Sequence, residues 1–185
     1  MPMTVTHALV PLVTAVSFGK RPLPWRLVIA AMIAATLPDL DAIWKHFLHL
    51  GSGSIYSHRG AAHSLFAALL VGAILSIFCK WFRVQRLTAA VVIAASTASH
   101  GLLDMMTDGG EGVAYLWPVT SVRLFADWRP LHSTQVHRAH FVGEALLRIR
   151  SEIWQLVLPM TAIMLLAVAG RAAVRAVRRK SIPQV

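Results

Sequence analysis

The sequence predicts an all-α integral membrane protein: a single domain over residues 1–185, built as a helical bundle of about five helices with a long ordered outer loop. Three observations predict this class. Hydrophobic residues make up 56% of the chain and charged residues only 14%, against about 25% charged in soluble domains. The charges are absent from five apolar stretches. Those stretches show no alternation of apolar and polar residues, which argues against strands.

The five stretches without Asp, Glu, Lys or Arg are the predicted helices. A bilayer core requires about 20 apolar helical residues. The last three stretches approach or meet that length, whereas the first two are short and are expected to be tilted, half-inserted or covered by neighbours. A soluble bundle with a buried hairpin is the alternative. The stretches are Met3–Gly19, Leu27–Leu37, Ala61–Cys79, Leu87–Leu103 and Ile153–Gly170.

The basic residues indicate how the chain crosses the membrane. The net charge is +10, and 11 of the 18 Lys and Arg residues form three groups. If all five stretches cross, these groups share one side, which the positive-inside rule makes cytoplasmic. This placement favours a membrane protein over a nucleic-acid-binding one, with 171–185 as a basic cytoplasmic tail. The groups are Lys20, Arg21 and Arg26; Lys80, Arg83 and Arg86; and Arg171, Arg175, Arg178, Arg179 and Lys180.

Histidines and aspartates gather at the opposite, outer face. His100 and Asp104 share one helix face, which Asp108 continues if the helix persists. Neutral His and carboxylate are usual ligands of catalytic zinc, and the single Cys79 excludes a thiolate site. The candidates exceed one tetrahedral site, so either two ions bind or some residues orient the ligands. They are His7, Asp39, Asp41, His58, His63, His100 and Asp104.

Each candidate has a simpler interpretation as a helix cap, a turn residue or a headgroup contact. Metal binding is favoured for His63, His100 and Asp104, because unpaired ionisable groups in membrane helices are costly. Ser64 is not expected to pair with His63 as a nucleophile, since adjacent helical residues point in different directions. His46, His49 and His132 are expected to cap helices or meet headgroups, Asp39 and Asp108 also fit turns, and His137 and His140 could be ligands or surface residues.

The segment Thr107–Arg150 is polar enough to lie outside the bilayer. Within it, Arg123 and Arg129 could clamp a phosphate or a carboxylate, a geometry that suits guanidinium groups. Headgroup anchoring is the alternative. Phe141–Ile153 mixes apolar and basic residues, which predicts an interfacial amphipathic helix leading into the last stretch.

Taken in order, the early His, PDLD, HRGAAHS, SHGLLDMMTDGGEGVAYLWP and DWRPL resemble the YdjM-type inner-membrane proteins. That family is described as membrane-bound metal-dependent hydrolases, LexA-regulated in the founding case. The resemblance covers roughly residues 4–165, and departs from the family at Asp108 and Asp127. More distantly, the pattern is similar to zinc-dependent phospholipase C and P1-type nucleases. The resemblance implies an all-helical hydrolase with metal-type residues at His7, Asp39, His58, His63, His100 and Asp104.

Residues and resemblance together predict a hydrolase at the periplasmic face of the bacterial inner membrane, acting on a membrane lipid or a lipid-linked substrate. One or two divalent ions would activate a water molecule, and Zn²⁺ is the preferred ion. A phosphoester is the preferred bond, and an ester or amide stays open. Asp39 or Asp41 is expected to act as a base or bridging ligand. The expected catalytic residues are Asp39, Asp41 and His63, and the expected substrate-binding residues are Arg123 and Arg129.

Two other classes of protein remain open. The same side chains could serve a membrane protein that binds or transports metal without catalysis, or the chain could be a structural or regulatory membrane protein without metal. Transport requires ligands along a path through the bilayer. The predicted ligands gather at one face instead, which favours catalysis.

Overall fold

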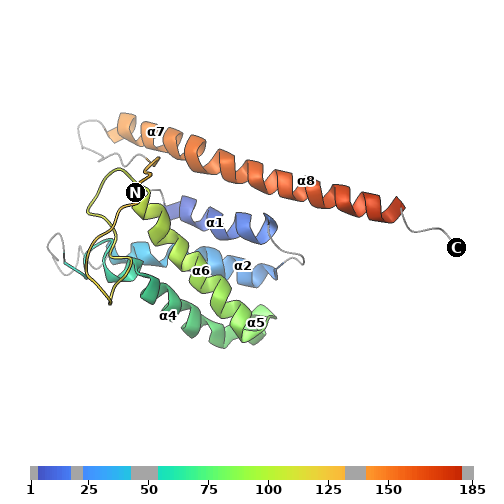
Figure 1. Cartoon of the computed structure of the whole chain (residues 1–185), viewed down its shortest axis with the longest axis horizontal. Coiled ribbons are helices and arrows are strands. Elements are labelled where there is room, and N and C mark those ends of the chain that lie inside the picture. Colours follow the sequence, from blue (N-terminus) through green and yellow to red (C-terminus); the bar gives the residue numbers. More distant parts are fainter. Residues whose placement is uncertain (1–3, 18–22, 43–53, 132–140, 181–185) are drawn as a thin grey trace.

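The computed structural model describes residues 4–17, 23–42, 54–131 and 141–180, which form a helical bundle (Figure 1). These residues contain no strand beyond two isolated bridges, so the prediction of an all-α protein is confirmed. Short 3₁₀ or π segments are labelled η. The elements are α1 (Thr4–Ser17), α2 (Trp25–Ala34), η1 (Leu37–Leu40), η2 (Ala61–His63), α4 (Leu65–Leu75), η3 (Ser76–Phe78), α5 (Cys79–Phe82), α6 (Arg86–Met105), α7 (Phe141–Glu152), η5 (Ile153–Val157) and α8 (Leu158–Lys180).

Three segments of the described chain are long and apolar enough to cross a membrane: Leu65–Phe82, Arg86–Met105 and Ile149–Val174. The helices α1 and α2 have 14 and 10 residues. At 1.5 Å per residue they reach about 21 and 15 Å, less than the hydrocarbon core of about 30 Å. The predicted division into two short and three long stretches therefore holds. The outward faces of the long segments are apolar, as lipid contact requires; Leu166 is 72% exposed.

The contact between α4 and α6 is close because it is lined by small residues. A Cβ at Gly72 would lie 2.5 Å from the carbonyl oxygen of Ala90, so only glycine permits this approach. Small residues at such contacts are typical of helix packing in membranes. The buried face of α6 continues from this contact to His100 and Asp104. The packing that holds α6 in place therefore also turns its polar end inward.

Figure 1 shows α7 and α8 as one long rod beside α1. The sequence predicted an interfacial helix over Phe141–Ile153. In the structure, α7 passes through the π segment η5 into α8 without a break. The helix also continues to Lys180, so the first part of the predicted basic tail is helical. Arg171 donates to the carbonyl oxygen of Ser17 (3.3 Å), where the end of α1 leaves carbonyls without helical partners.

The two ends of the bundle are formed by different elements (Figure 1). The N-terminus of α1, the C-terminus of α6 and the loop over 106–131 lie at one end, which corresponds to the predicted outer face. The start of α6 and the end of α8 lie at the other. The predicted long ordered outer loop is present up to Leu131. Its two bridges join Thr107 to Leu131 and Val113 to Leu124.

Candidate metal centre

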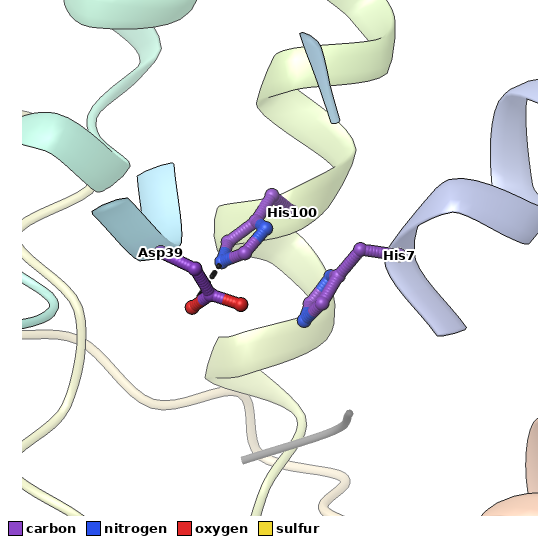
Figure 2. A group of neighbouring side chains, drawn as sticks. All are labelled: His7, Asp39 and His100. Carbon is purple, nitrogen blue, oxygen red and sulfur yellow. Dashed lines mark ion pairs between the residues drawn. The ribbon is translucent and has the colours of Figure 1, made fainter. Parts of the chain in front are cut away.

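Four segments far apart in the sequence bring ionisable side chains into one cluster at the loop-covered end. Figure 2 shows three of these side chains, His7, Asp39 and His100, which project from three different elements. His7, His63, His100 and Asp104 are at most 2% exposed. Buried ionisable groups require partners or a bound ion. The cluster consists of His7 from α1, Asp39 and Asp41 from η1 and its end, His58, Arg59 and His63 from the segment around η2, and His100 and Asp104 from α6.

A glycine in α6 allows the segments to meet. His100 and Asp104 are four residues apart and project from the same helix face. Gly101 lies between them, and a Cβ there would lie 2.5 Å from the carbonyl oxygen of His63 and 2.9 Å from the ring of Tyr115. The glycine therefore lets η2 approach α6 closely enough for the two histidine rings to meet.

The separation of His63 and His100 fits two ligands of one metal ion. Their Nε2 atoms lie 3.2 Å apart. Two nitrogen ligands at about 2.0–2.1 Å from a tetrahedral Zn²⁺ are about 3.3 Å from each other. The observed distance therefore matches the distance that a shared ion would impose.

The other nitrogen of each ring faces an acceptor. His100 Nδ1 lies 2.8 Å from the carbonyl oxygen of Ala35, which can only accept, so this Nδ1 carries the proton. His63 Nδ1 lies 3.0 Å from Asp41 Oδ2, which favours the same tautomer. Burial lowers the pKa of His63, so the ring is neutral at neutral pH. With His100 also neutral, both Nε2 atoms would present lone pairs to each other, and a cation between them would stabilise the pair.

Carboxylates surround the two rings. Asp104 Oδ2 lies 3.5 Å from His63 Nε2 and 3.9 Å from His100 Nε2, and Asp39 Oδ1 lies 3.3 Å from His100 Nε2. Three overlapping sets have donor atoms that all lie within 4.8 Å of one another. The cluster therefore has donors for one ion and for a second close to it. The sets are His7, Asp39 and His100; Asp39, His58 and His63; and His63, His100 and Asp104.

Asp41 connects two histidines. Its Oδ1 lies 2.6 Å from His58 Nδ1, and its Oδ2 faces His63 Nδ1. Burial alone would raise the pKa of Asp41, but the hydrogen bonds with His58 and His63 outweigh burial and hold this pKa below its ordinary value. Carboxylates placed in this way orient metal-binding histidines and fix their tautomers. The geometry suits that role; the role as base or bridging ligand stays a prediction.

Arg59 is a buried member of the cluster for which the sequence suggested no role. It is 2% exposed. Its Nη1 donates to the carbonyl oxygen of Gly109 (2.8 Å), its Nη2 donates to the hydroxyl of Thr107 (2.9 Å), and its Nε lies 3.2 Å from Asp104 Oδ2. A Cβ at Gly110 would lie 2.6 Å from Nη1. One signal for Arg59 was available in the sequence. It lies inside HRGAAHS, between histidines that were predicted to gather with the three aspartates of the cluster.

The charge of the cluster favours a divalent cation. With neutral histidines, the carboxylates of Asp39, Asp41 and Asp104 contribute three negative charges and the guanidinium of Arg59 one positive charge, which leaves a formal charge of −2. An uncompensated buried charge is costly. One divalent ion would neutralise the cluster.

His7 is buried against His100 inside the cluster. It is fully buried, and its ring stacks on that of His100 with 3.7 Å between centroids. Within the described residues neither ring nitrogen of His7 makes a hydrogen bond, and its Nε2 lies 3.8 Å from Asp104 Oδ1. A buried polar group without a partner is destabilising. A metal ion or a water molecule would supply such a partner to His7.

The structure brings together all seven candidate ligands, but it does not bring Arg123 or Arg129 into the cluster. Arg123 donates to the carbonyl oxygens of Ser54 (2.9 Å) and His58 (3.2 Å), so it holds the outer loop against the segment before η2. Arg129 is exposed, and its guanidinium lies 5.1 Å from the centroid of the Phe125 ring. Their contact with a substrate stays a prediction.

Two other polar residues have clear positions. The helix α6 ends at Met105, so Asp108 lies exposed in the following turn and does not extend the face of His100. Ser64 is the N-cap of α4, and its hydroxyl accepts from the backbone N–H of Ala67 (3.0 Å). This agrees with the expectation that Ser64 is not a nucleophile. The histidines His46, His49, His132, His137 and His140 lie outside the described residues.

Membrane-length helices and a buried His–Asp cluster at one end define a helical membrane protein with a candidate metal centre. The family model described as YdjM inner membrane protein matches residues 1–177. The chain is also 40% identical over 131 residues to inner membrane protein YbcI of Escherichia coli (strain K12), a match that covers 70% of this chain and 75% of that protein. No solved structure matches the chain. The chain therefore belongs to the YdjM family of inner membrane proteins, as its motifs indicated.

Proposed function

We propose that this chain is a metal-dependent hydrolase that acts at the periplasmic face of the inner membrane on a phosphoester of a lipid or lipid-linked substrate. One observation carries the proposal: the facing Nε2 atoms of His63 and His100, 3.2 Å apart, in a buried cluster with a formal charge of −2. The Nδ1 atoms of both rings face the acceptors Asp41 and Ala35, which leaves both Nε2 atoms available to an ion.

The residues present fit a divalent metal. His63, His100 and Asp104 would hold the ion, and His7, Asp39 and His58 are further ligands for the same ion or a second one. Nitrogen and carboxylate donors without sulfur suit Zn²⁺. A bound ion supplies two effects, a lower pKa of a water molecule and polarisation of the scissile bond.

Asp39 is the carboxylate best placed to accept a proton from the attacking water. Its side chain is 10% exposed, whereas that of Asp104 is fully buried and paired with Arg59. A base at the edge of a buried site can exchange its proton with solvent after each turnover. Asp41 and Arg59 would position the other groups, Asp41 by holding two histidines and Arg59 by holding Asp104.

The two ends of the bundle support a periplasmic site. The cluster lies where α1 begins and α6 ends, and the basic residues Arg86 and Arg171 lie towards the opposite end. The positive-inside rule assigns a basic end to the cytoplasm. A site close to the membrane surface meets lipid headgroups, which favours an amphiphilic phosphoester as substrate.

Purified full-length protein, loaded with Zn²⁺ and mixed with phospholipids, tests this proposal by release of phosphorylated headgroups measured by ³¹P NMR. Release is expected to require the metal, to be lost in Asp39→Asn, and to be kept in Asp127→Asn, an exposed aspartate outside the cluster. Stoichiometric metal binding without release from phospholipids or lipid-linked phosphoesters, together with metal uptake into proteoliposomes, would contradict the proposal and support a transporter.

A further inference from the structure

An apolar cavity of about 300 Å³ lies between α1 and α6, and it is open on one side, where Thr14, Val91 and Ala95 are exposed. Val10 and Pro11 of α1 line it three and four residues after His7, and Ser96 of α6 lines it four residues before His100. One turn of helix separates residues at this spacing. The two helices that bring these histidines into the cluster therefore also form the cavity wall immediately below it.

From the cluster, the cavity extends toward the basic end of the bundle. Its lining reaches Val91 in α6 and Leu23 just before α2. The lining residues of α6 run from Val91 to Ser96, which corresponds to a rise of about 8 Å along the helix. The cavity therefore runs along the helices, in the direction that a lipid tail takes from a headgroup at the outer surface.

The lining of the cavity is mostly apolar. No residue that lines it is charged. Its hydroxyls are bonded to their own helices, because Thr14 Oγ1 donates to the carbonyl oxygen of Val10 (2.7 Å) and Ser96 Oγ donates to that of Val92 (2.7 Å). An apolar chain can occupy such a cavity without losing hydrogen bonds, whereas a polar solute would lose its hydrogen bonds to water.

We propose that this cavity receives one acyl chain of the substrate and so places the substrate's phosphoester at the cluster. This inference rests on the proposed function. A volume of about 300 Å³ lies at the lower end of the range for ligand pockets, which fits one chain. A tail gains little free energy on moving from surrounding lipid into an apolar cavity. The cavity therefore selects and aligns the substrate, and contributes little to affinity.

A second apolar groove provides an internal comparison. It has a volume of about 570 Å³, lies between α2 and the α4–α5 segment, and is lined by Arg26, Phe78 and Trp81 among others. These residues lie toward the end opposite the cluster. The groove also reaches Ile33 at the other end of α2, so labelling at Phe78 and Trp81 is taken as the background against which the cavity is judged.

Photo-labelling of the Zn²⁺-loaded full-length protein in nanodiscs tests the inference. The probes are two lysophosphatidylethanolamines that carry a diazirine either near the headgroup or at the chain end, and the labelled residues are mapped by mass spectrometry. The first probe is expected to label the level of Val10 and Ser96, and the second the level of Leu23 and Val91. Filling the cavity with Ala15→Leu and Ala95→Leu is expected to abolish both labels. Ala73→Leu, an exposed position on α4, is expected to keep them.

Metal content and thermal stability are measured on every variant; if the double variant does not fold, the single Ala95→Leu variant gives the same readout. Labelling of the cavity at the background level of the Trp81 groove, identical positions for both probes, or labels that survive filling of the cavity in a folded variant would each overturn the inference. The proposed function is tested separately from the cavity. It would fail if the wild type bound no metal or released no headgroup, even with the depth-dependent labels present.

Discussion

The helices α6 and α8 differ in their surroundings, although both are apolar and long enough to cross a membrane. Within the apolar 18-residue window of Arg86–Met105, half of the residues are buried, against 6% in the corresponding window of Ile149–Val174. α6 packs against α1, α2 and α4, whereas α8 packs mainly on α1 and η5. The polar residues follow this difference, since His100 and Asp104 lie on the buried face of α6. Ionisable groups persist in membrane helices where protein covers them.

The largest effect on stability is expected where α4 meets α6. Gly72→Leu forces a side chain into the space beside the carbonyl oxygen of Ala90, 2.5 Å from the position of a Cβ. Overpacking of this kind costs about 3 kcal/mol. The matched control is Gly170→Leu in α8, where a Cβ meets no atom within 4 Å. Thermal unfolding in detergent should show a clear loss for the first variant alone. Equal losses would remove the distinction between α6 and α8.

A smaller effect, on metal affinity, is expected at Asp41. Asp41→Asn leaves the fold intact but weakens the orientation of His58 and His63, so the affinity for Zn²⁺ should fall roughly 10–100-fold, as for other groups that orient metal ligands. Isothermal titration with Zn²⁺ measures this change, with Asp127→Asn as the control. Unchanged affinity in Asp41→Asn would show that Asp41 does not position the ligands. Complete loss of binding in a folded variant would make it a ligand itself.

The smallest effect is expected at the N-terminus of α4. Ser64 caps this helix through the backbone N–H of Ala67, and removal of a capping hydroxyl costs about 1 kcal/mol. Ser64→Ala should therefore lower the thermal midpoint modestly and leave metal content unchanged. Loss of metal or of phosphoester hydrolysis without loss of stability would restore a chemical role for Ser64 beside His63.

Much of the architecture could be predicted from the sequence, because a bilayer imposes simple rules. Uncharged stretches of sufficient length predict the long helices. Because successive helices cross the membrane in opposite directions, Pro38-Asp39, His63 and His100 are expected at the same face. Helix periodicity alone pairs His100 with Asp104. The seven candidate ligands converge in the structure for these reasons.

The remaining features depend on contacts between segments that no local pattern encodes. The carbonyl oxygen of Ala35 fixes the tautomer of His100, and a backbone group leaves no signal in the sequence. Arg59 reaches Thr107 and Gly109 only after the outer loop has folded over it. The bonds of Arg123 to the carbonyl oxygens of Ser54 and His58 were also not predictable, because an isolated arginine in a loop has no distinguishing pattern. The continuity of α7 with α8 likewise depends on packing against α1.

The metal content of the purified full-length protein tests the central claim most directly. Inductively coupled plasma mass spectrometry of protein prepared without chelators should find at least one zinc ion per chain in the wild type and in Asp127→Asn, and loss of that metal in folded His100→Ala, since His100 supplies one of the two facing Nε2 atoms. A wild-type protein that binds no metal on reconstitution, or full metal content in both His63→Ala and His100→Ala, would contradict the account.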